Sequence, residues 1–451
     1  MWLANWVCGL SETDVPAAVR RKAVACIQDT LGVALAGSHS RAAVAARTLC
    51  PAQEDGPATM LGQARGCSPR LAAFVNATAA HALDFDDNCY AGFVHGSAVI
   101  VPALLACAQA NNAVGSRAIT AFVAGAECEY AVGAASGGRL YEKGWWTTGV
   151  LGPIGAAMAA AHLFELGPQR TCHALGLAVA MACGTKMCFG TDAKPLMAGR
   201  ASEAGVLSAY LAVAGASGPA RPFEDTNGFA ARFNDGIFDV SAFDRLGDEW
   251  YLERPGVDVK RIPVCLSAHA AVDAVRELVA RHRLLASEVA RVVCDVPPIV
   301  VSNLCYALPE TLAQARFSMP FAVAMTLCDP DWGLAAMDLK CLAQPGLRDL
   351  MRRVSLTTGS SWQSPARRDA APEGAHVRLE LHDGRILQGY RAKALGSPDE
   401  PLTEAQLDRK FRDCAGPVLG EQANAVLARL HALDSGQPVQ ALLGALQPLA
   451  P

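Results

Sequence analysis

A short stretch of the chain concentrates two histidines and three aspartates between apolar runs: His81, Asp84, Asp86, Asp87 and His95. Because 51 % of the residues are hydrophobic and only 18 % are charged, such a group of charges is either paired or used for chemistry. A neutral imidazole beside a carboxylate can remove a proton from a substrate and return it. This stretch is therefore the first candidate for an active site.

Helical spacing divides the group into two faces. If one helix runs through residues 71–88, then His81, Asp84 and Asn88 share a face, and the other two aspartates point away from it. In the alternative interpretation, His81 is a hydrogen-bonded core histidine and the acids close a helix end. The spacing alone leaves both interpretations open.

His95 favours the chemical interpretation. It precedes the apolar run 96–108, and a helix that begins there presents backbone N–H groups and a histidine to an anion. A metal site built from the two histidines and three acids is a less favoured alternative. The sixteen cysteines include no Cys-x-x-Cys pair and no zinc-type spacing with histidine, so we expect them to be reduced and the protein to hold no metal.

Composition and charge exclude several classes of function. The formal net charge is −4, and lysine and arginine are scattered, which gives no nucleic-acid footprint. No uncharged span suits a membrane helix, and the N-terminal residues lack a signal-peptide pattern, so we expect a cytoplasmic protein without a membrane partner. No glycine-rich loop of nucleotide-binding spacing follows a predicted strand.

Two tryptophans and two threonines lie ahead of an alanine-rich helix in the stretch 141–152. Thr147 or Thr148 is expected to cap that helix. Trp145 and Trp146 could form the wall of a pocket. A separate stretch, beginning at Arg316, has the pattern of a turn into a core helix, and we assign it a structural role.

Isolated basic residues could supply fixed positive charge to a carboxylate substrate. Lys194 and Arg200 lie near glycines in an apolar region, although Arg200 could instead pair with Glu203 on a helix surface. Lys260 lies in a β-prone run and His269 at a helix start, where a solvated lysine and a capping histidine are the alternatives. Basic groups beside a His/Asp pair indicate proton transfer next to a carboxylate, with cations holding the enolate charge.

The periodicity of the chain predicts a mostly helical protein with a smaller mixed region after residue 218. The predicted elements are helices over 11–37, 41–50, 269–280 and 402–433, helical composition throughout 70–220, a short turn or extended piece over 59–62, a β-prone run over 258–265, a strand over 289–296, an exposed loop over 356–374 and a hairpin over 376–387.

Several segments spread along nearly the whole chain carry a family pattern: His81 to Asp87 with His95 and Pro102, Asp29 to Gly37, Ala124 to Glu127, Lys194 to Ala201, Pro263 to His269, Phe317 to Phe321, Asp399 to Thr403, and Lys410 with Phe411. Together they resemble the MmgE/PrpD family, which includes 2-methylcitrate dehydratase, cis-aconitate decarboxylase and iminodisuccinate epimerase. The resemblance implies a homodimer with a cofactor-independent active site between a large all-α domain (1–255 and 400–451) and a smaller α/β lid domain (256–399).

The resemblance also implies roles for individual residues. Asp84 and His95 match the family's catalytic aspartate and histidine, and Lys194 and Lys260 match its two active-site lysines. We expect His95 to exchange the proton and Asp84 to orient or assist it. The residues expected to contact the substrate are His81, Asn88, Trp146, Thr148, Arg200 and His269.

Four positions depart from the family pattern. Trp146 and Met197 stand where the family has histidines, Asn88 replaces a threonine and Ile262 replaces an aromatic residue, whereas Thr148 is retained. Losing two imidazoles removes proton-transfer capacity and makes the pocket more apolar. The departures therefore bear on the substrate more than on the fold.

The leading hypothesis is a dehydratase-like lyase acting on a small anionic di- or tricarboxylate, which Lys194, Lys260 and Arg200 would bind. An epimerase of an iminodisuccinate-like acid is the first alternative, because it needs fewer general acids. A homologue that binds the ligand without turning it over is the second.

Overall fold

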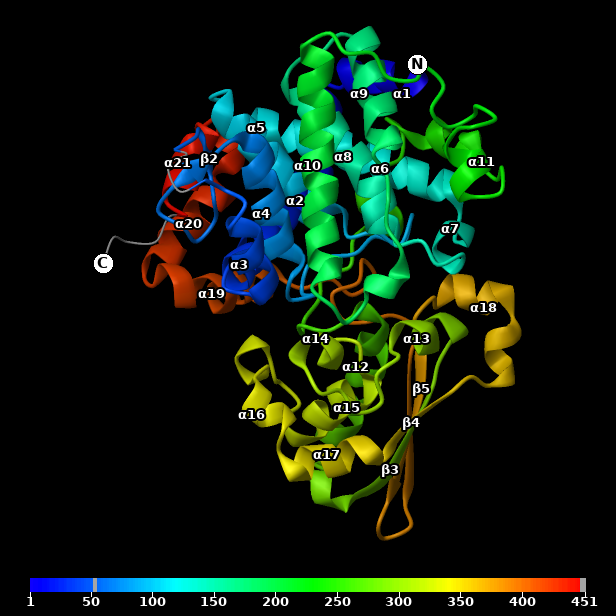
Figure 1. Cartoon of the computed structure of the whole chain (residues 1–451). Helices are drawn as coiled ribbons and strands as arrows, with labels where there is room; N and C mark the ends of the chain where they lie inside the picture. Colours follow the sequence, from blue (N-terminus) through cyan, green and yellow to red (C-terminus); the bar gives the residue numbers. More distant parts are fainter. Residues whose placement is uncertain (52–54, 447–451) are drawn as a thin grey trace.

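The computed structural model describes residues 1–51 and 55–446, and helices predominate (Figure 1). Helices make up 59 % of the structure and strands 8 %, which confirms the mostly α prediction. One large hydrophobic cluster spans Leu3 to Leu252 and continues from Phe411 to Leu446, and a second spans Ile262 to Leu381. We call the parts around these clusters the helical domain and the lid domain. The boundaries between the two domains along the chain remain a prediction.

The helical domain contains two groups of helices that are distant in sequence. The first group is α1 (Trp2–Gly9), α2 (Ala17–Gly37), α3 (Arg41–Arg47), α4 (Pro69–His81), α5 (Gly96–Ala110), α6 (Gly115–Ser136), α7 (Arg139–Glu142), α8 (Thr147–Leu163), α9 (Pro168–Ala180), α10 (Ala193–Val213) and α11 (Phe229–Phe233). The second is α19 (Glu404–Leu419), α20 (Gln422–His431) and α21 (Val439–Gly444). A two-stranded sheet of β1 (Ala58–Thr59) and β2 (Gly66–Cys67) precedes α4.

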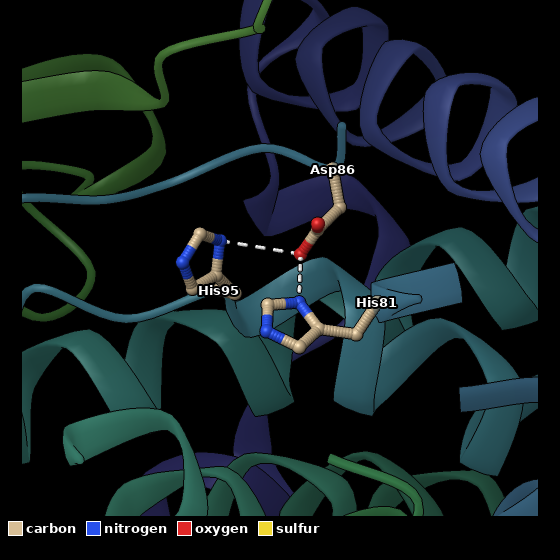
Figure 2. Close-up of side chains that lie close together, drawn as sticks. All are labelled: His81, Asp86 and His95. Carbon is tan, nitrogen blue, oxygen red and sulfur yellow. Dashed lines mark hydrogen bonds and ion pairs between the residues drawn. The ribbon is translucent and has the colours of Figure 1, made fainter. Parts of the chain in front are cut away.

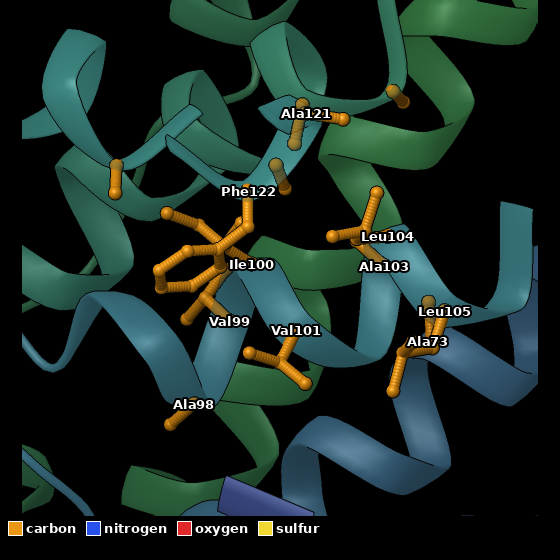
Figure 3. Close-up of a cluster of buried hydrophobic side chains, with 14 of the residues drawn as sticks. Ala73, Ala98, Val99, Ile100, Val101, Ala103, Leu104, Leu105, Ala121 and Phe122 are labelled. Carbon is orange, nitrogen blue, oxygen red and sulfur yellow. The ribbon is translucent and has the colours of Figure 1, made fainter. Parts of the chain in front are cut away.

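Small residues let the central helices approach closely. A Cβ atom at Gly125 of α6 would lie 2.5 Å from the carbonyl oxygen of Gly155 on α8, so no larger residue fits there. Helix α5 is buried along almost its whole length, and Figure 3 shows its Val99, Ile100 and Val101 in the cluster with Phe122 of α6. A helix that is apolar on all sides belongs in the middle of a domain.

The lid domain is a four-stranded sheet covered by helices, and it lies below the helical domain in Figure 1. The strand order is β4-β3-β5-β6, with β4 parallel to β3 and the other pairs antiparallel. Its strands are β3 (Val289–Asp295), β4 (Val354–Thr357), β5 (Ala375–Leu381) and β6 (Ile386–Arg391). Its helices are α12 (His269–His282), α13 (Pro298–Asn303), α14 (Leu312–Ala315), α15 (Met319–Cys328), α16 (Leu339–Leu342), α17 (Pro345–Arg352) and α18 (Pro365–Ala370).

Most predicted elements are confirmed, including the strand over 289–296 and the hairpin over 376–387. Two predictions are wrong. The loop over 356–374 contains α18 and a short 3-10 helix, Ser360–Gln363, and the β-prone run 258–265 forms a single bridge, between Asp258 and Asn88. No helix among the described residues is long and apolar enough to cross a membrane.

Candidate active site

The segment between α4 and α5 carries the charged group, and it is not helical. Helix α4 ends at His81, and Asp84 has a backbone φ of 51°, in the left-handed region that Asp tolerates better than most residues. The chain therefore reverses at Asp84. The predicted common face of His81, Asp84 and Asn88 is wrong, because Asp86 turns back onto His81 instead of pointing away.

Asp86 connects the two histidines (Figure 2). Its Oδ2 lies 2.7 Å from Nδ1 of His81 and 3.2 Å from Nδ1 of His95. Nδ1 of His95 also lies 2.7 Å from the main-chain oxygen of Asp87. Both neighbours of this nitrogen can only accept hydrogen bonds, so Nδ1 of His95 carries a proton. In the neutral ring, the lone pair is then on Nε2, on the side away from Asp86.

His81 is a neutral bridge between an acid and a lysine. Burial and the charge of Lys194 lower the pKa of His81 to about 4, although Asp86 acts in the opposite direction. Its Nδ1 donates to Asp86, and its Nε2 accepts from Nζ of Lys194 at 2.6 Å. The ring of Trp146 packs at 5.3 Å from the His81 ring, which fixes the orientation of the imidazole.

Asp84 is held between two lysines. Its Oδ1 accepts from Lys194 at 2.6 Å, its Oδ2 lies 3.4 Å from Nζ of Lys260, and its main-chain oxygen accepts from Lys260 at 2.8 Å. Burial would raise the pKa of Asp84, but the positive charges of Lys194 and Lys260 hold it well below its usual range. Asp84 therefore stays a carboxylate and holds the ammonium of Lys194.

The segment is also held from the far end of the chain. Lys410 of α19 pairs with Asp29 of α2 at 2.6 Å and donates to the main-chain oxygen of Phe85 at 2.9 Å. Its ammonium lies 4.0 Å from the centre of the Phe85 ring. Lys410 belongs to a family segment of the sequence, but nothing in its spacing indicated this contact.

The two threonines before α8 position the loop that carries His95. Oγ1 of Thr148 accepts from the backbone N–H of His95 at 3.0 Å, and Oγ1 of Thr147 donates to the main-chain oxygen of Phe93 at 2.5 Å. Neither threonine caps α8, so that prediction is wrong. Thr148 acts through His95 and does not line the cavity beside it.

A partly open cavity lies where the two domains meet. Its lining residues are Asp84, Asn88, Phe93, His95, Tyr141, Trp146, Phe189 and Lys194 from the helical domain, and Cys265, Leu266, Asn303, Phe317 and Glu373 from the lid domain. The volume is about 30 Å³, which is room for about two water molecules. A carboxylate substrate is larger than this volume.

Besides Thr148, four residues expected at the site do not line the cavity: His81, which lies behind Lys194, and Arg200, Lys260 and His269. Arg200 is exposed and lies 3.4 Å from Glu203, as in the surface alternative. Lys260 is fully buried, and it stays charged because Asp84 and Asp86 overcome the effect of burial and raise its pKa. His269 bonds the main-chain oxygen of Val264 at 3.2 Å, and burial and the Lys260 charge lower its pKa to about 3.

The lid domain contributes groups that the sequence did not indicate. Glu373 lines the cavity from a Pro-Glu-Gly turn that we had assigned to an exposed loop. Arg316 precedes Phe317 of the cavity wall; its Nε is buried and makes no hydrogen bond within the described residues, and its charge acts on Asp84. Glu373 lies in no pattern that distinguishes it from a surface charge, and for the stretch at Arg316 the sequence predicted only a structural role.

His81, Asp86 and His95 are also close enough to be considered as metal ligands. One ligand atom from each lies within 4.8 Å of the others. However, the ammonium of Lys194 is 2.6 Å from Nε2 of His81, and a second ammonium lies behind Asp84. Since like charges this close repel, the positive surroundings favour proton transfer over cation binding at this site.

Comparison with known proteins agrees with the family resemblance. The family model of the MmgE/PrpD N-terminal domain matches residues 2–240, and that of the MmgE/PrpD C-terminal domain matches residues 262–433. The chain belongs to the MmgE/PrpD family. The matched regions contain every residue that lines the cavity.

Among its MmgE/PrpD relatives are proteins described as cis-aconitate decarboxylases. The human protein is 27 % identical over 374 residues, covering 78 % of this chain and 73 % of its own length. The Aspergillus terreus protein is 25 % identical over 448 residues, covering 93 % and 89 %. The cis-aconitate decarboxylase-like protein oryM of Aspergillus oryzae is 25 % identical over 467 residues, covering 98 % and 95 %. Decarboxylases are lyases, so lyase chemistry occurs within this family.

Proposed function

We propose that this protein is a cofactor-independent, dehydratase-like lyase that acts on a small di- or tricarboxylate by moving a proton at the carbon next to a carboxylate. His95 carries the proposal: two acceptors fix the proton of the ring on Nδ1, which leaves Nε2 as a base at the cavity. The lyases among its relatives support the reaction class.

The reaction begins when Nε2 of His95 takes the proton from the carbon beside a substrate carboxylate. The carboxylate becomes an enolate, and the ammonium of Lys194 stabilises the added negative charge. Asp84 holds that ammonium at the cavity. Asp86 lies 3.2 Å from Nδ1 of His95 and stabilises the imidazolium that forms.

In this proposal, two cations bind the carboxylates. Lys194 lines the cavity, with the rings of Trp146, Phe189 and Phe317 between 5.2 and 5.5 Å from its Nζ. Arg316 precedes Phe317 of the cavity wall, and its buried Nε makes no hydrogen bond within the part of the chain that the structure describes. We assign the second carboxylate to Arg316 in place of Arg200, which is exposed and paired with Glu203.

An epimerase is the second candidate. The observation that favours it is Trp146, which packs on His81 where the family pattern has a histidine, so that side of the cavity offers no second imidazole. Removal and return of a proton at one carbon needs no leaving group, and therefore no general acid to protonate one.

The proposal is tested by proton NMR of the protein in D₂O with citrate-like, aconitate-like and iminodisuccinate-like acids. Formation or consumption of an alkene identifies a lyase and its substrate. Deuterium exchange without net elimination identifies the epimerase. Silence with every acid contradicts both, and ligand-induced thermal shifts would then identify a homologue that binds without turnover.

A further inference from the structure

Glu373 is the acid that the lid domain brings to the cavity. It lies in the turn between α18 and β5, and only 8 % of its surface is exposed. It lines the cavity that His95 lines from the helical domain. Burial raises the pKa of Glu373 above its usual value, although two hydroxyl donors and the charges of Lys260 and His95 act in the opposite direction.

A network of neutral groups orients this carboxyl. Tyr90 of the helical domain donates to its Oε2 at 2.7 Å, and Ser267 of the lid domain donates to its Oε1. Ser267 in turn accepts from Asn303 at 3.0 Å, and Asn303 accepts from Tyr141 at 3.0 Å. The two tyrosines belong to the helical domain, so the network forms only when the domains are together.

The network differs from the surroundings of Asp84 in one decisive way. Two ammonium groups keep Asp84 ionised, whereas the direct partners of Glu373 are hydroxyl groups, which accept a hydrogen bond as readily as they donate one. Glu373 can therefore hold a proton without breaking the network. It is the lining acid whose surroundings allow proton exchange.

We propose that Glu373 is a catalytic general acid that protonates the leaving group, so that the substrate is a β-hydroxy di- or tricarboxylate. Nε2 of His95 takes the proton from the carbon beside the carboxylate, and the electron pair of that C–H bond forms the C=C bond. The C–O bond of the neighbouring carbon breaks, and its oxygen takes the proton of Glu373 and leaves as water. His95 is then an imidazolium and Glu373 a carboxylate, and exchange with solvent restores both after the alkene leaves.

This inference rests on the proposed function, and it names the residue that protonates the leaving hydroxyl group. It also gives the lid domain a chemical role, because a residue of the helical domain removes the proton and a residue of the lid domain protonates the hydroxyl group that leaves. Substituting one of these residues should therefore slow one step without stopping the other.

The test uses the full-length protein with the hydroxy acid on which the wild type acts. Glu373→Gln is expected to keep deuterium exchange at the carbon beside the carboxylate within a few-fold, and to lose about 10²–10⁴-fold in elimination, the usual contribution of a general acid. An analogue with chlorine in place of the hydroxyl group needs no proton to leave. Glu373→Gln should therefore eliminate chloride at close to the wild-type rate.

Two further variants keep the test decisive. Glu380→Gln, on β5 and paired with Arg378 at 3.2 Å, is the matched control and should change neither rate. If Glu373→Gln does not fold, Glu373→Asp keeps an acid but withdraws it by one methylene, and the same contrast between water and chloride is expected.

Each outcome is informative. Elimination of water at the wild-type rate by Glu373→Gln overturns the role of Glu373 and leaves the proposed function standing. Equal losses of exchange, water elimination and chloride elimination also overturn it, because they indicate a structural role. A wild type that neither exchanges nor eliminates with any acid overturns the proposed function and this inference with it.

Discussion

The two domains contribute unlike halves to the cavity. The helical domain supplies most of the fixed charges: Asp84 is locked between the ammonium groups of Lys194 and of Lys260, the latter from the predicted lid domain, and Asp86 holds both histidines. The lid domain supplies Glu373, which sits in a network of hydroxyl and amide groups. One half therefore consists of fixed charges, and the other of neutral groups around an acid.

This difference indicates which part of the proposed reaction each domain supports. Fixed charges stabilise an enolate best when they do not reorganise during the reaction, and the helical domain meets that requirement by burial. A group that must both give and regain a proton needs neutral partners, and the lid domain provides them. The comparison can be tested by substituting residues of each domain in turn.

The largest effect is expected from His95→Gln, which removes the base of the helical half. The rate of deuterium exchange into the substrate should fall by about 10²–10⁴-fold, while circular dichroism and the melting temperature stay close to wild type, because His95 is partly exposed at the cavity. NMR in D₂O gives the rate. Unchanged exchange would show that His95 is not the base.

The next largest effect is expected from Lys194→Met, which leaves Asp84 with one ammonium partner. Removing one member of a buried ion pair costs about 3–5 kcal/mol, and urea unfolding should show a loss of this size together with loss of turnover. Lys143→Met, at an ion pair outside the cavity, is the control. A loss of turnover without a change in unfolding free energy would mean that Asp84 is not held by charge.

A moderate effect is expected from Arg316→Ala in the lid half. If its guanidinium binds the second carboxylate, KM should rise by about 10–100-fold, the loss of about 1.5–3 kcal/mol for a charged hydrogen bond, with a smaller change in kcat. Arg200→Ala is the matched control, because Arg200 is exposed and pairs with Glu203. Equal KM values for the two variants would remove Arg316 from the site.

Per pH unit, the smallest effect is expected from Asp87→Asn, and it appears as a pH dependence of stability. Burial raises the pKa of Asp87 to about 7. At pH values between about 3.9, the pKa of an unfolded aspartate, and about 7, the unfolded state has released the Asp87 proton while the folded state retains it. The free energy of unfolding therefore falls as the pH rises, by up to about 1.4 kcal/mol per pH unit.

Asparagine cannot ionise, so this variant should gain stability relative to wild type as pH rises from 5 to 7. The His95 contact, which is to the main-chain oxygen of Asp87, is retained. Urea unfolding at three pH values measures the difference. A difference independent of pH would mean that Asp87 titrates normally.

The sequence predicted the parts of the site that depend on local pattern. His81, the three aspartates and His95 stand out because charge is rare in the apolar stretch around them, and the structure brings two of these acids into contact with the histidines and lysines. The geometry within the group was not predictable from helical spacing, because Asp84 adopts a left-handed backbone and ends the periodicity.

The lid half could not be predicted from the sequence. Glu373 lies in a turn whose composition is typical of a surface loop, and its burial depends on the helical domain, which contributes Tyr90. Arg316 begins a stretch for which the sequence predicted only a structural role, and it is half-buried. Arg200 shows the converse: its neighbours suggested a site, but its position on α10 faces solvent and Glu203. The sequence pattern of a segment indicates which secondary structure it can form. Whether its side chains are buried depends on the packing of segments that are distant in sequence.

Lys410 ties the His81–His95 segment to a helix that is synthesised more than three hundred residues later. On the ribosome, the chain emerges from its N-terminus, and domains fold as they appear. Helices α1 to α11 and the lid domain can therefore assemble before α19 exists, but the loop at Phe85 lacks its anchor until then. The His81–His95 segment is therefore held in place only after α19 has been synthesised. A nascent or truncated chain that stops before α19 is expected to be partly folded and inactive.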